Sequence, residues 1–280
     1  MEKVSRDAAS TKVDTKKQKA YLSSDPLAST LRPMKELSQQ DLQRCLSKGT
    51  DLSFKEQDRA IWILQSRQLK EWLVAPRSRA LLLNGNGEGS PTFSPCTLLT
   101  AKLLEGLRQV QPIICLFYFC SLHTSDQRED ASTLVKTMVS QLLHCGVTYD
   151  TSFLTPKDLE KIEQNDLNTL CMLFQQLMQQ IPSGILLFLV VDGINFYERS
   201  ERRQDFLEVL KVLLAILEER RNLAFKILLS CHGRSSFAKN LVGKENTLTA
   251  PSVVDGSRQG WSEQRFRKAL GQEISNLGKE

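Results

Sequence analysis

Several features that assign proteins to special classes are missing from this sequence of 280 residues. No apolar run approaches the roughly 20 residues that a membrane-spanning helix needs, so we expect no membrane association. The first residues, MEKVSRDAASTK, hold no apolar stretch like that of a secretory signal peptide. No unit recurs at a period of about 20–50 residues, which argues against a solenoid.

Cysteine and histidine do not occur in the patterns that bind metals. The seven cysteines form no C-x-x-C pair, and His123, His144 and His232 are far apart in the chain. Such spacing excludes the common zinc motifs. Scattered thiols in apolar surroundings are typical of reduced, buried cysteines in an intracellular protein, and we therefore predict a cytoplasmic location.

A strong charge of one sign is also missing from most of the chain. The formal net charge is +5, of which residues 1–50 carry about +4 and residues 251–280 about +1. A near-neutral body does not fit a nucleic-acid-binding protein, so we expect no nucleic-acid partner. The basic cluster Lys16, Lys17 and Lys19 is a weak nuclear-import signal, and a solvated tail is the simpler interpretation.

Hydrophobic residues make up 41% and charged residues 25% of the chain, as in ordinary globular proteins. Apolar runs with the length of strands occur at 79–83, 113–120, 185–191 and 225–229, and Leu248 begins a shorter one. Segments with apolar residues at helical spacing separate these runs. The alternation predicts an α/β fold, a three-layer sandwich with a mostly parallel sheet of about five strands.

We expect three segments along the chain. Residues 1–50 have little apolar periodicity and predict a disordered basic tail, with at most a short helix near Asp41 to Leu46. Residues 51–250 form the α/β domain, which begins with a capping box at Ser53 and Glu56. Residues 251–280 form a helical extension.

A glycine loop follows the first expected strand. Three glycines before a helix that opens near Pro95 let the backbone approach a phosphate group at the helix N-terminus. In the P-loop pattern G-x-x-x-x-G-K-[ST], counted from Gly85, Pro91 occupies the lysine position and Thr92 the hydroxyl position. The candidate phosphate loop consists of Gly85, Asn86, Gly87, Glu88, Gly89, Ser90 and Thr92. A flexible turn is the alternative interpretation.

A second motif ends the apolar run ILLFLVV at Asp192. A hydrophobic strand ending in aspartate is how a Walker B motif holds Mg²⁺, and Thr92 together with Asp192 would supply the metal ligands if a nucleotide binds. The carboxyl ends of parallel strands share one edge of a sheet, so we expect the glycine loop and Asp192 to meet there.

The order LLLNGNGEG, LLFLVVDGINFYE and FKILLSCHGRSS resembles the NACHT and nephrocystin-like P-loop NTPase domains of the STAND class, most closely the short, degenerate versions in fungal proteins. The resemblance covers roughly residues 55–250. It implies a sheet in which the sensor strand separates the Walker A and Walker B strands. It also implies an ATP or ADP site with Mg²⁺ across the strand tips.

The catalytic letters of this family are largely replaced. The loop has no Walker A lysine, and Asn195 and Phe196 stand where the family has two acids, with Glu198 two positions late. The sensor-like residues are Ser230, His232 and a displaced Arg234. Losing the lysine alone removes a charge-assisted contact worth roughly 1.5–3 kcal/mol in binding.

Three functions therefore stay open. The first is a degenerate domain that binds nucleotide or acts without catalysis in signalling or protein interaction. The second is a slow Mg²⁺-dependent ATP or GTP hydrolase that uses Thr92 and Asp192. The third is a protein-interaction scaffold with no nucleotide site. We expect a protein partner or self-association in each case.

Overall fold

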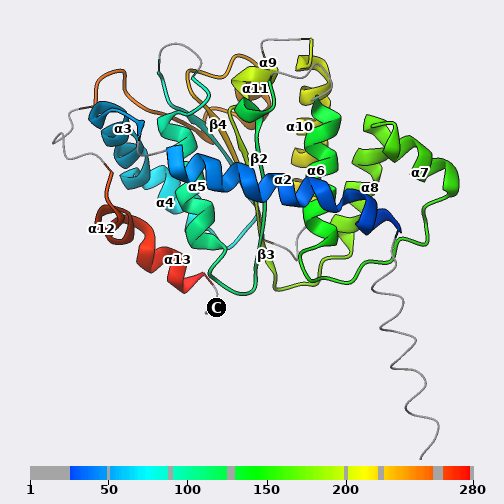
Figure 1. The fold of residues 1–280 in the computed structure, drawn as a ribbon. Helices are drawn as coiled ribbons and strands as arrows, with labels where there is room; N and C mark the ends of the chain where they lie inside the picture. Colours follow the sequence, from blue (N-terminus) through cyan, green and yellow to red (C-terminus); the bar gives the residue numbers. More distant parts are fainter. Residues whose placement is uncertain are drawn as a thin grey trace, which may run out of the picture.

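The computed structural model describes residues 26–48, 51–87, 91–124, 130–198, 201–219, 224–254 and 261–277. It confirms the α/β fold, with helices on both faces of a central sheet (Figure 1). Glu88, Gly89 and Ser90 of the candidate loop, and the basic cluster at Lys16 to Lys19, lie outside these residues.

The sheet has five strands, all parallel, in the order β2-β3-β4-β1-β5. The strands are β1 (Arg79–Asn84), β2 (Ile113–Phe119), β3 (Leu186–Asp192), β4 (Ala224–Cys231) and β5 (Thr247–Thr249). Strand β4 lies between β1 and β3, as the resemblance implied. The three central strands are almost completely buried because apolar side chains cover both of their faces.

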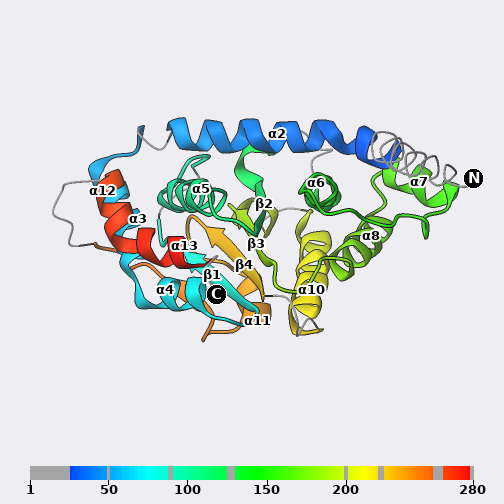
Figure 2. The same ribbon diagram turned by 90° about the horizontal axis from the view of Figure 1, so that it is seen from below.

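Helices cover the two faces with separate hydrophobic cores. One core contains α6 (Ala131–Leu143), α8 (Leu167–Gln179) and α10 (Arg203–Glu219). The other contains α3 (Phe54–Gln65), α4 (Arg67–Val74) and α5 (Pro95–Leu107). Figure 2 shows these groups on opposite sides of the strands. The three-layer sandwich is thereby confirmed.

Shorter elements complete the described part of the chain. They are η2 (Cys120–Leu122), α7 (Pro156–Glu163), α9 (Asn195–Glu198), α11 (Ala238–Val242), α12 (Glu263–Phe266), the π-helical turn η3 (Arg267–Gly271) and α13 (Gln272–Asn276). Phe266, Leu270 and Ile274 of the C-terminal helices pack into the core that contains α5.

Local capping signals fix several of the helix starts. The capping box at Ser53 and Glu56 is present, and Thr155 and Asp158 form a second one at α7. The segment that follows Ser53 forms two consecutive helices. Ser66 ends the first and caps the second by accepting from the Leu69 N–H at 3.3 Å.

The N-terminal segment departs most from expectation. Helix α2 (Pro26–Lys48) is long and ordered, so the prediction of a disordered tail over all of residues 1–50 is wrong for this stretch. Its inward face includes Leu27, Leu31, Leu42 and Cys45, with the buried polar residues Ser38 and Asp41 between them. Because these polar positions interrupt the apolar pattern, the sequence shows little amphipathic periodicity here.

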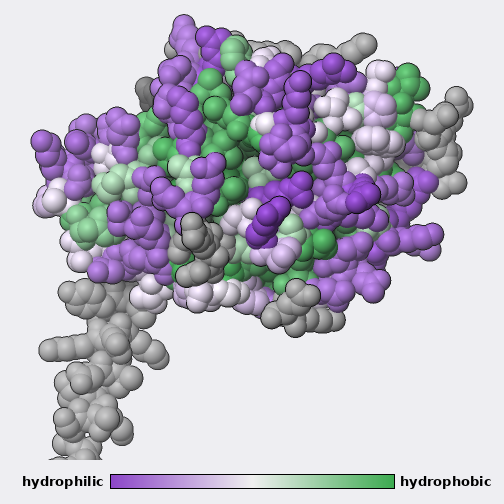
Figure 3. Space-filling view, turned by 180° about the vertical axis from the view of Figure 1, so that it is seen from behind, coloured by the Kyte–Doolittle hydropathy of each residue, from purple (hydrophilic) through white to green (hydrophobic). Residues whose placement is uncertain are grey.

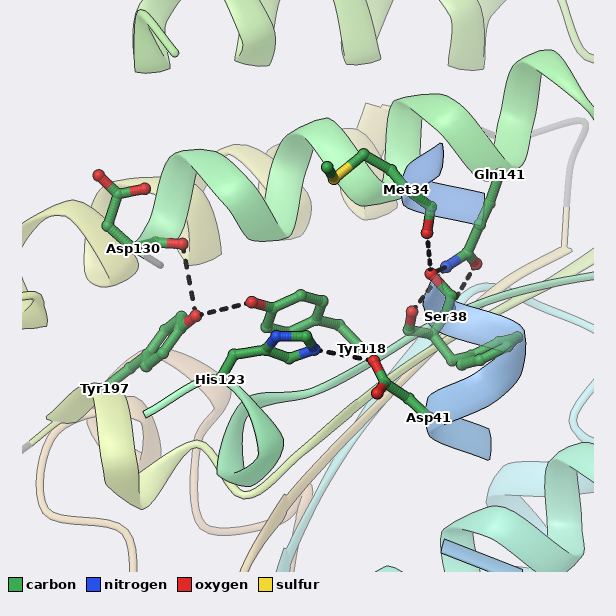
Figure 4. Close-up of polar contacts among 9 residues, drawn as sticks. Met34, Ser38, Asp41, Tyr118, His123, Asp130, Gln141 and Tyr197 are labelled. Atoms are coloured by element: carbon green, nitrogen blue, oxygen red, sulfur yellow. Dashed lines mark hydrogen bonds and ion pairs between the residues drawn. The ribbon is translucent and has the colours of Figure 1, made fainter. Parts of the chain in front are cut away.

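Polar contacts hold α2 against the β2 edge of the sheet. Nε2 of His123 lies 2.8 Å from Oδ2 of Asp41, and both residues are buried. Ser140 on α6 donates a hydrogen bond of 2.5 Å to the Leu31 carbonyl. Figure 4 shows His123 directed toward Asp41, and Gln141 directed toward Ser38. The buried polar positions of α2 are therefore satisfied by α6 and by the loop after β2.

The side of the molecule opposite α2 has hydrophobic side chains scattered between hydrophilic ones (Figure 3). Among the described residues, no helix combines the length and the hydropathy needed to cross a bilayer. All seven cysteines lie in the described part and are free thiols.

Candidate functional site

The candidate site lies at the carboxyl edge of the sheet. Strands β1, β4 and β3 are parallel neighbours that end at Asn84, Cys231 and Asp192. The segments that follow them therefore emerge at one edge, where ligands bind in open α/β sheets. The described part of the glycine loop and Asp192 thus emerge at the same edge, as predicted, and the Asp192 side chain contacts Thr97 on α5, the helix that the loop enters.

Asp192 is the centre of this edge and is only 1% exposed. Its Oδ2 accepts a hydrogen bond of 2.8 Å from the Thr97 hydroxyl, and its Oδ1 accepts from the Ser230 hydroxyl. Burial raises the pKa of the Asp192 carboxyl above its usual value, and hydrogen bonds from Ser230, Thr97 and Thr100 oppose this rise. One carboxylate thus ties β3 to both α5 and β4.

Four buried thiols lie around this carboxylate. Burial raises the pKa of Cys96 and of Cys120, and the negative charge of Asp192 raises both further. The same two causes raise the pKa of Cys45. Cys231 follows Ser230 at the end of β4 and is also buried. The raised pKa keeps Cys45, Cys96 and Cys120 in the neutral thiol form, which limits their reactivity.

The hydroxyl that meets Asp192 belongs to Thr97 rather than to Thr92. Thr92 is exposed and precedes the helix, because Ser94 is the N-cap of α5 and Pro95 is its first residue. Thr97 lies in the first turn, where its hydroxyl faces the end of β3. Counting the P-loop pattern from Gly85 missed it, and the Ser-Pro start of the helix was the signal that could have located it.

The N-terminus of α5 has few free donors for a phosphate group. Pro95 has no N–H, and the Thr97 N–H donates to the Ser94 hydroxyl at 3.1 Å. The Leu98 N–H is bonded to the Ser94 carbonyl at 3.0 Å. With no lysine in the loop either, the donors of the described helix start do not fit a Mg²⁺-bound triphosphate held in the P-loop manner.

The described part of the glycine loop is bonded to the segment after β4. The N–H groups of Gly85, Asn86 and Gly87 donate to the carbonyls of Cys231, Gly233 and His232 at 2.8, 3.0 and 2.9 Å. A Cβ atom on Gly87 would lie 2.3 Å from the His232 ring, and one on Gly85 would lie 2.6 Å from the His232 carbonyl oxygen. These two glycines therefore permit close packing of one loop against the other.

Two arginines hold this loop from outside. Nη1 of Arg59, on α3, donates to the carbonyls of Gly85 and Asn86 at 2.7 and 2.9 Å. The predicted sensor residue Arg234 donates from Nε to Asn86 Oδ1 at 2.9 Å, and its side chain is exposed. Asn86 itself has a left-handed backbone, with φ of 52°. Arg59 belongs to no motif, so its role could not be predicted from the sequence.

Glu198 stabilises the segment that enters α11. Its carboxylate accepts from the Ser235 hydroxyl at 2.7 Å and from the N–H groups of Ser236, Phe237 and Ala238 at 2.9, 3.0 and 2.6 Å. The residue is 2% exposed. Asn195, at the position of a family acid, accepts from the His232 N–H at 3.2 Å. Both side chains are therefore used in joining α9 to the segment after β4.

A pocket of about 350 Å³ opens beside the loop, between α3 and the start of α5. Lys55, Glu56 and Arg59 line one side of it, and Gly87 and His232 line the other. Among the described residues, no group of three or more His, Cys, Asp or Glu side chains is placed to hold a metal ion.

Comparison with known proteins identifies the family. The family described as nephrocystin 3, N-terminal, matches residues 59–232. This range runs from α3 to the end of β4 and covers more than half of the chain. A search of curated proteins gave no match. The matched range contains strands β1 to β4 of the sheet. Because the match covers more than half of the chain, the chain belongs to the nephrocystin 3 N-terminal family.

Proposed function

We propose that this domain is a degenerate P-loop module of the NACHT and STAND type that does not hydrolyse nucleotide and acts through protein interaction. The observation that carries the proposal is that the Asp192 carboxylate is hydrogen-bonded to Thr97 and Ser230, beside a helix start with few free donors among the described residues. Phosphoryl transfer depends on positioned charge, above all on a cation near the β- and γ-phosphates and on an acid that orients water.

Among the described residues at this edge, no lysine and no free acid stand at the family positions, and Arg59 and Arg234 are bonded to oxygens of the loop. The loop has no lysine, Asn195 replaces an acid, and the oxygens of Glu198 are used by the α11 segment. The hydrophobic strands remain intact, so the fold is stable without the chemistry. This combination supports an interaction role more strongly than a catalytic one.

Isothermal titration with ATP, ADP and GTP, each with and without Mg²⁺, tests the proposal together with a turnover assay. We expect turnover at the background rate, and no increase in affinity when Mg²⁺ is added. Turnover of several per minute that Asp192→Ala abolishes would show that the domain is an enzyme. Activity that rises with protein concentration would indicate a cation, such as an arginine, supplied by a second copy.

A second candidate function is nucleotide binding without hydrolysis, which the pocket beside the loop favours. Lys55 and Arg59 line it with positive charge beside the negative charge of Glu56, and the buried His232 forms part of its wall. Binding of ADP that does not depend on Mg²⁺ and that weakens in Lys55→Glu would support this function. Lys244→Glu, which changes an exposed lysine away from the pocket, is the control.

A further inference from the structure

The outer edge of β2 is covered by a side chain at one point. Strand β2 pairs with β3 on one side only, because it is the first strand in the sheet order. Gln141 on α6 accepts from the Phe117 N–H and donates to the Phe117 carbonyl, each at 2.8 Å. The side-chain amide thus occupies the place that a peptide group of a neighbouring strand would take.

The next backbone groups on the outer side of β2 belong to Cys115, two residues before Phe117. Backbone groups of a strand alternate between its two sides, so the N–H and C=O of Cys115 face the same way as those of Phe117, about 7 Å away. No described residue is bonded to them. A pocket of about 350 Å³ opens at this point and is lined by Ile113, Cys115 and Phe117 of β2. Helix α2 crosses in front of the sheet in Figure 1 and borders this pocket with Lys35, Ser38 and Gln39.

The charges around this pocket have one sign. Lys35 on α2 and Arg108 at the end of α5 line it, and none of its lining residues is an aspartate or glutamate. The Arg108 guanidinium lies 5.8 Å from the centre of the Phe117 ring. Burial raises the pKa of the Cys115 thiol to about 12, and the charge of Arg108 opposes that rise, which places this cation near Cys115.

His144 adds a ring nitrogen to the lining of this pocket. Its Nδ1 lies 2.7 Å from the Ser140 carbonyl, which can only accept, so Nδ1 carries a hydrogen. Its Nε2 is buried without a hydrogen-bond partner among the described residues. The pocket therefore combines a strand edge, two cations and a ring nitrogen that has no partner.

We propose that this pocket, which we call the β2-edge pocket, binds an acidic segment of a partner protein in extended conformation. The segment adds outside β2, with its backbone bonded to the N–H and C=O of Cys115 and its carboxylates beside Lys35 and Arg108. Strand addition obtains affinity from backbone hydrogen bonds and specificity from alternate side chains. The site lies toward the amino-terminal end of β2, whereas Asp192 is the register partner of Phe119 at the carboxyl end.

Fluorescence anisotropy with a fluorescein-labelled, eight-residue peptide of alternating Glu and Val tests this site on the full chain. We expect saturable binding that weakens about tenfold in the double variant Lys35→Glu, Arg108→Glu. The matched control is Arg32→Glu, which changes an exposed residue of α2 outside the pocket, and we expect less than a twofold effect. The same peptide with N-methyl groups on alternate residues should also bind about tenfold more weakly.

A second measurement protects the test against a misfolded variant. A peptide of alternating Lys and Val should bind the charge-reversed double variant better than it binds the natural protein. Hydrogen exchange should show added protection at residues 113–117 with the acidic peptide. The proposal is wrong if no peptide binds in the millimolar range, if Arg32→Glu weakens binding equally, or if N-methylation has no effect.

Discussion

The Thr97 hydroxyl donates a hydrogen bond of 2.8 Å to the buried carboxylate of Asp192, although 95 residues of sequence separate them. This contact joins the first turn of α5 to the end of β3. With the bond from Ser230, it holds three elements of the candidate site together.

Replacing Thr97 by valine should destabilise the protein. Valine keeps the shape of the side chain and leaves a buried carboxylate oxygen without its donor, which costs about 1–3 kcal/mol in the free energy of unfolding. Urea denaturation measures the change. Thr92→Val is the control, since Thr92 is exposed, and we expect no measurable effect there. Equal effects of the two substitutions would contradict the assignment.

Glu198→Gln tests whether this residue stabilises the α11 segment. A glutamine cannot accept at its nitrogen, so part of the set of four bonds to residues 235–238 is lost. We expect a loss of about 1–3 kcal/mol in stability and faster hydrogen exchange over residues 235–242. The exposed Glu201→Gln serves as control. Unchanged hydrogen exchange over residues 235–242 in Glu198→Gln would show that Glu198 does not stabilise the α11 segment.

Gln141→Leu should expose the dependence of the β2 edge on one side chain. The substitution leaves the N–H and C=O of Phe117 without partners, which we expect to cost about 2–4 kcal/mol for two buried groups. Calorimetric or denaturant unfolding measures the loss. Gln43→Leu, on the exposed side of α2, should change stability little. If Gln141→Leu loses no more stability than Gln43→Leu, water or another group replaces the amide as the partner of Phe117.

Lys226 gives stability a specific dependence on pH. Burial lowers its pKa to about 7 from the ordinary 10.5, with a smaller contribution from Arg79. Between these values the unfolded chain binds more protons than the folded one, so stability rises with pH. The stability gained in this way is fully present above pH 10.5 and is lost as the pH falls to about 7, the pKa of Lys226 in the folded protein.

Lys226→Met should remove this dependence of stability on pH. In the natural protein, Nζ of Lys226 donates to the carbonyls of Trp72 and Ala75, so we expect the variant to be less stable overall. The test is therefore the shape of the pH profile of the unfolding free energy. Unfolding free energies measured from pH 6 to pH 10 would show the difference between natural protein and variant growing with pH. The exposed Lys244→Met should follow the natural profile. Parallel profiles for Lys226→Met would refute the shifted pKa.

The parallel sheet could be predicted because its strands are continuous apolar runs, whereas the place of β4 between β1 and β3 was implied only by the family resemblance. Such runs must be covered on both sides, and the segments between them have helical spacing, so a parallel sheet with helices on both faces follows. The position of Asp192 at a strand end required nothing more. Helix α2 could not be found in this way, because its inward face includes Ser38 and Asp41.

The hydrogen-bond partners of polar side chains could not be predicted from the sequence either. Thr97 and Arg59 stand in ordinary helical sequence, and only their contacts with Asp192 and with the loop carbonyls give them a role. Glu198 was expected near a nucleotide, yet its oxygens contact the segment before α11. The sequence shows which groups a polar side chain is able to bind. The folded structure decides which of them lie within hydrogen-bond distance.

The sequence by itself determined the α/β fold, the parallel strands and the edge at which Asp192 lies, because hydrophobic burial depends on the local pattern of apolar residues. The tertiary structure alone decided which hydroxyl meets that carboxylate, how the glycine loop is bonded, and that the β2 edge is left open beside Lys35 and Arg108. These features are hydrogen bonds and charges between residues distant in the chain. Their energies depend on distance and burial, which no local pattern specifies.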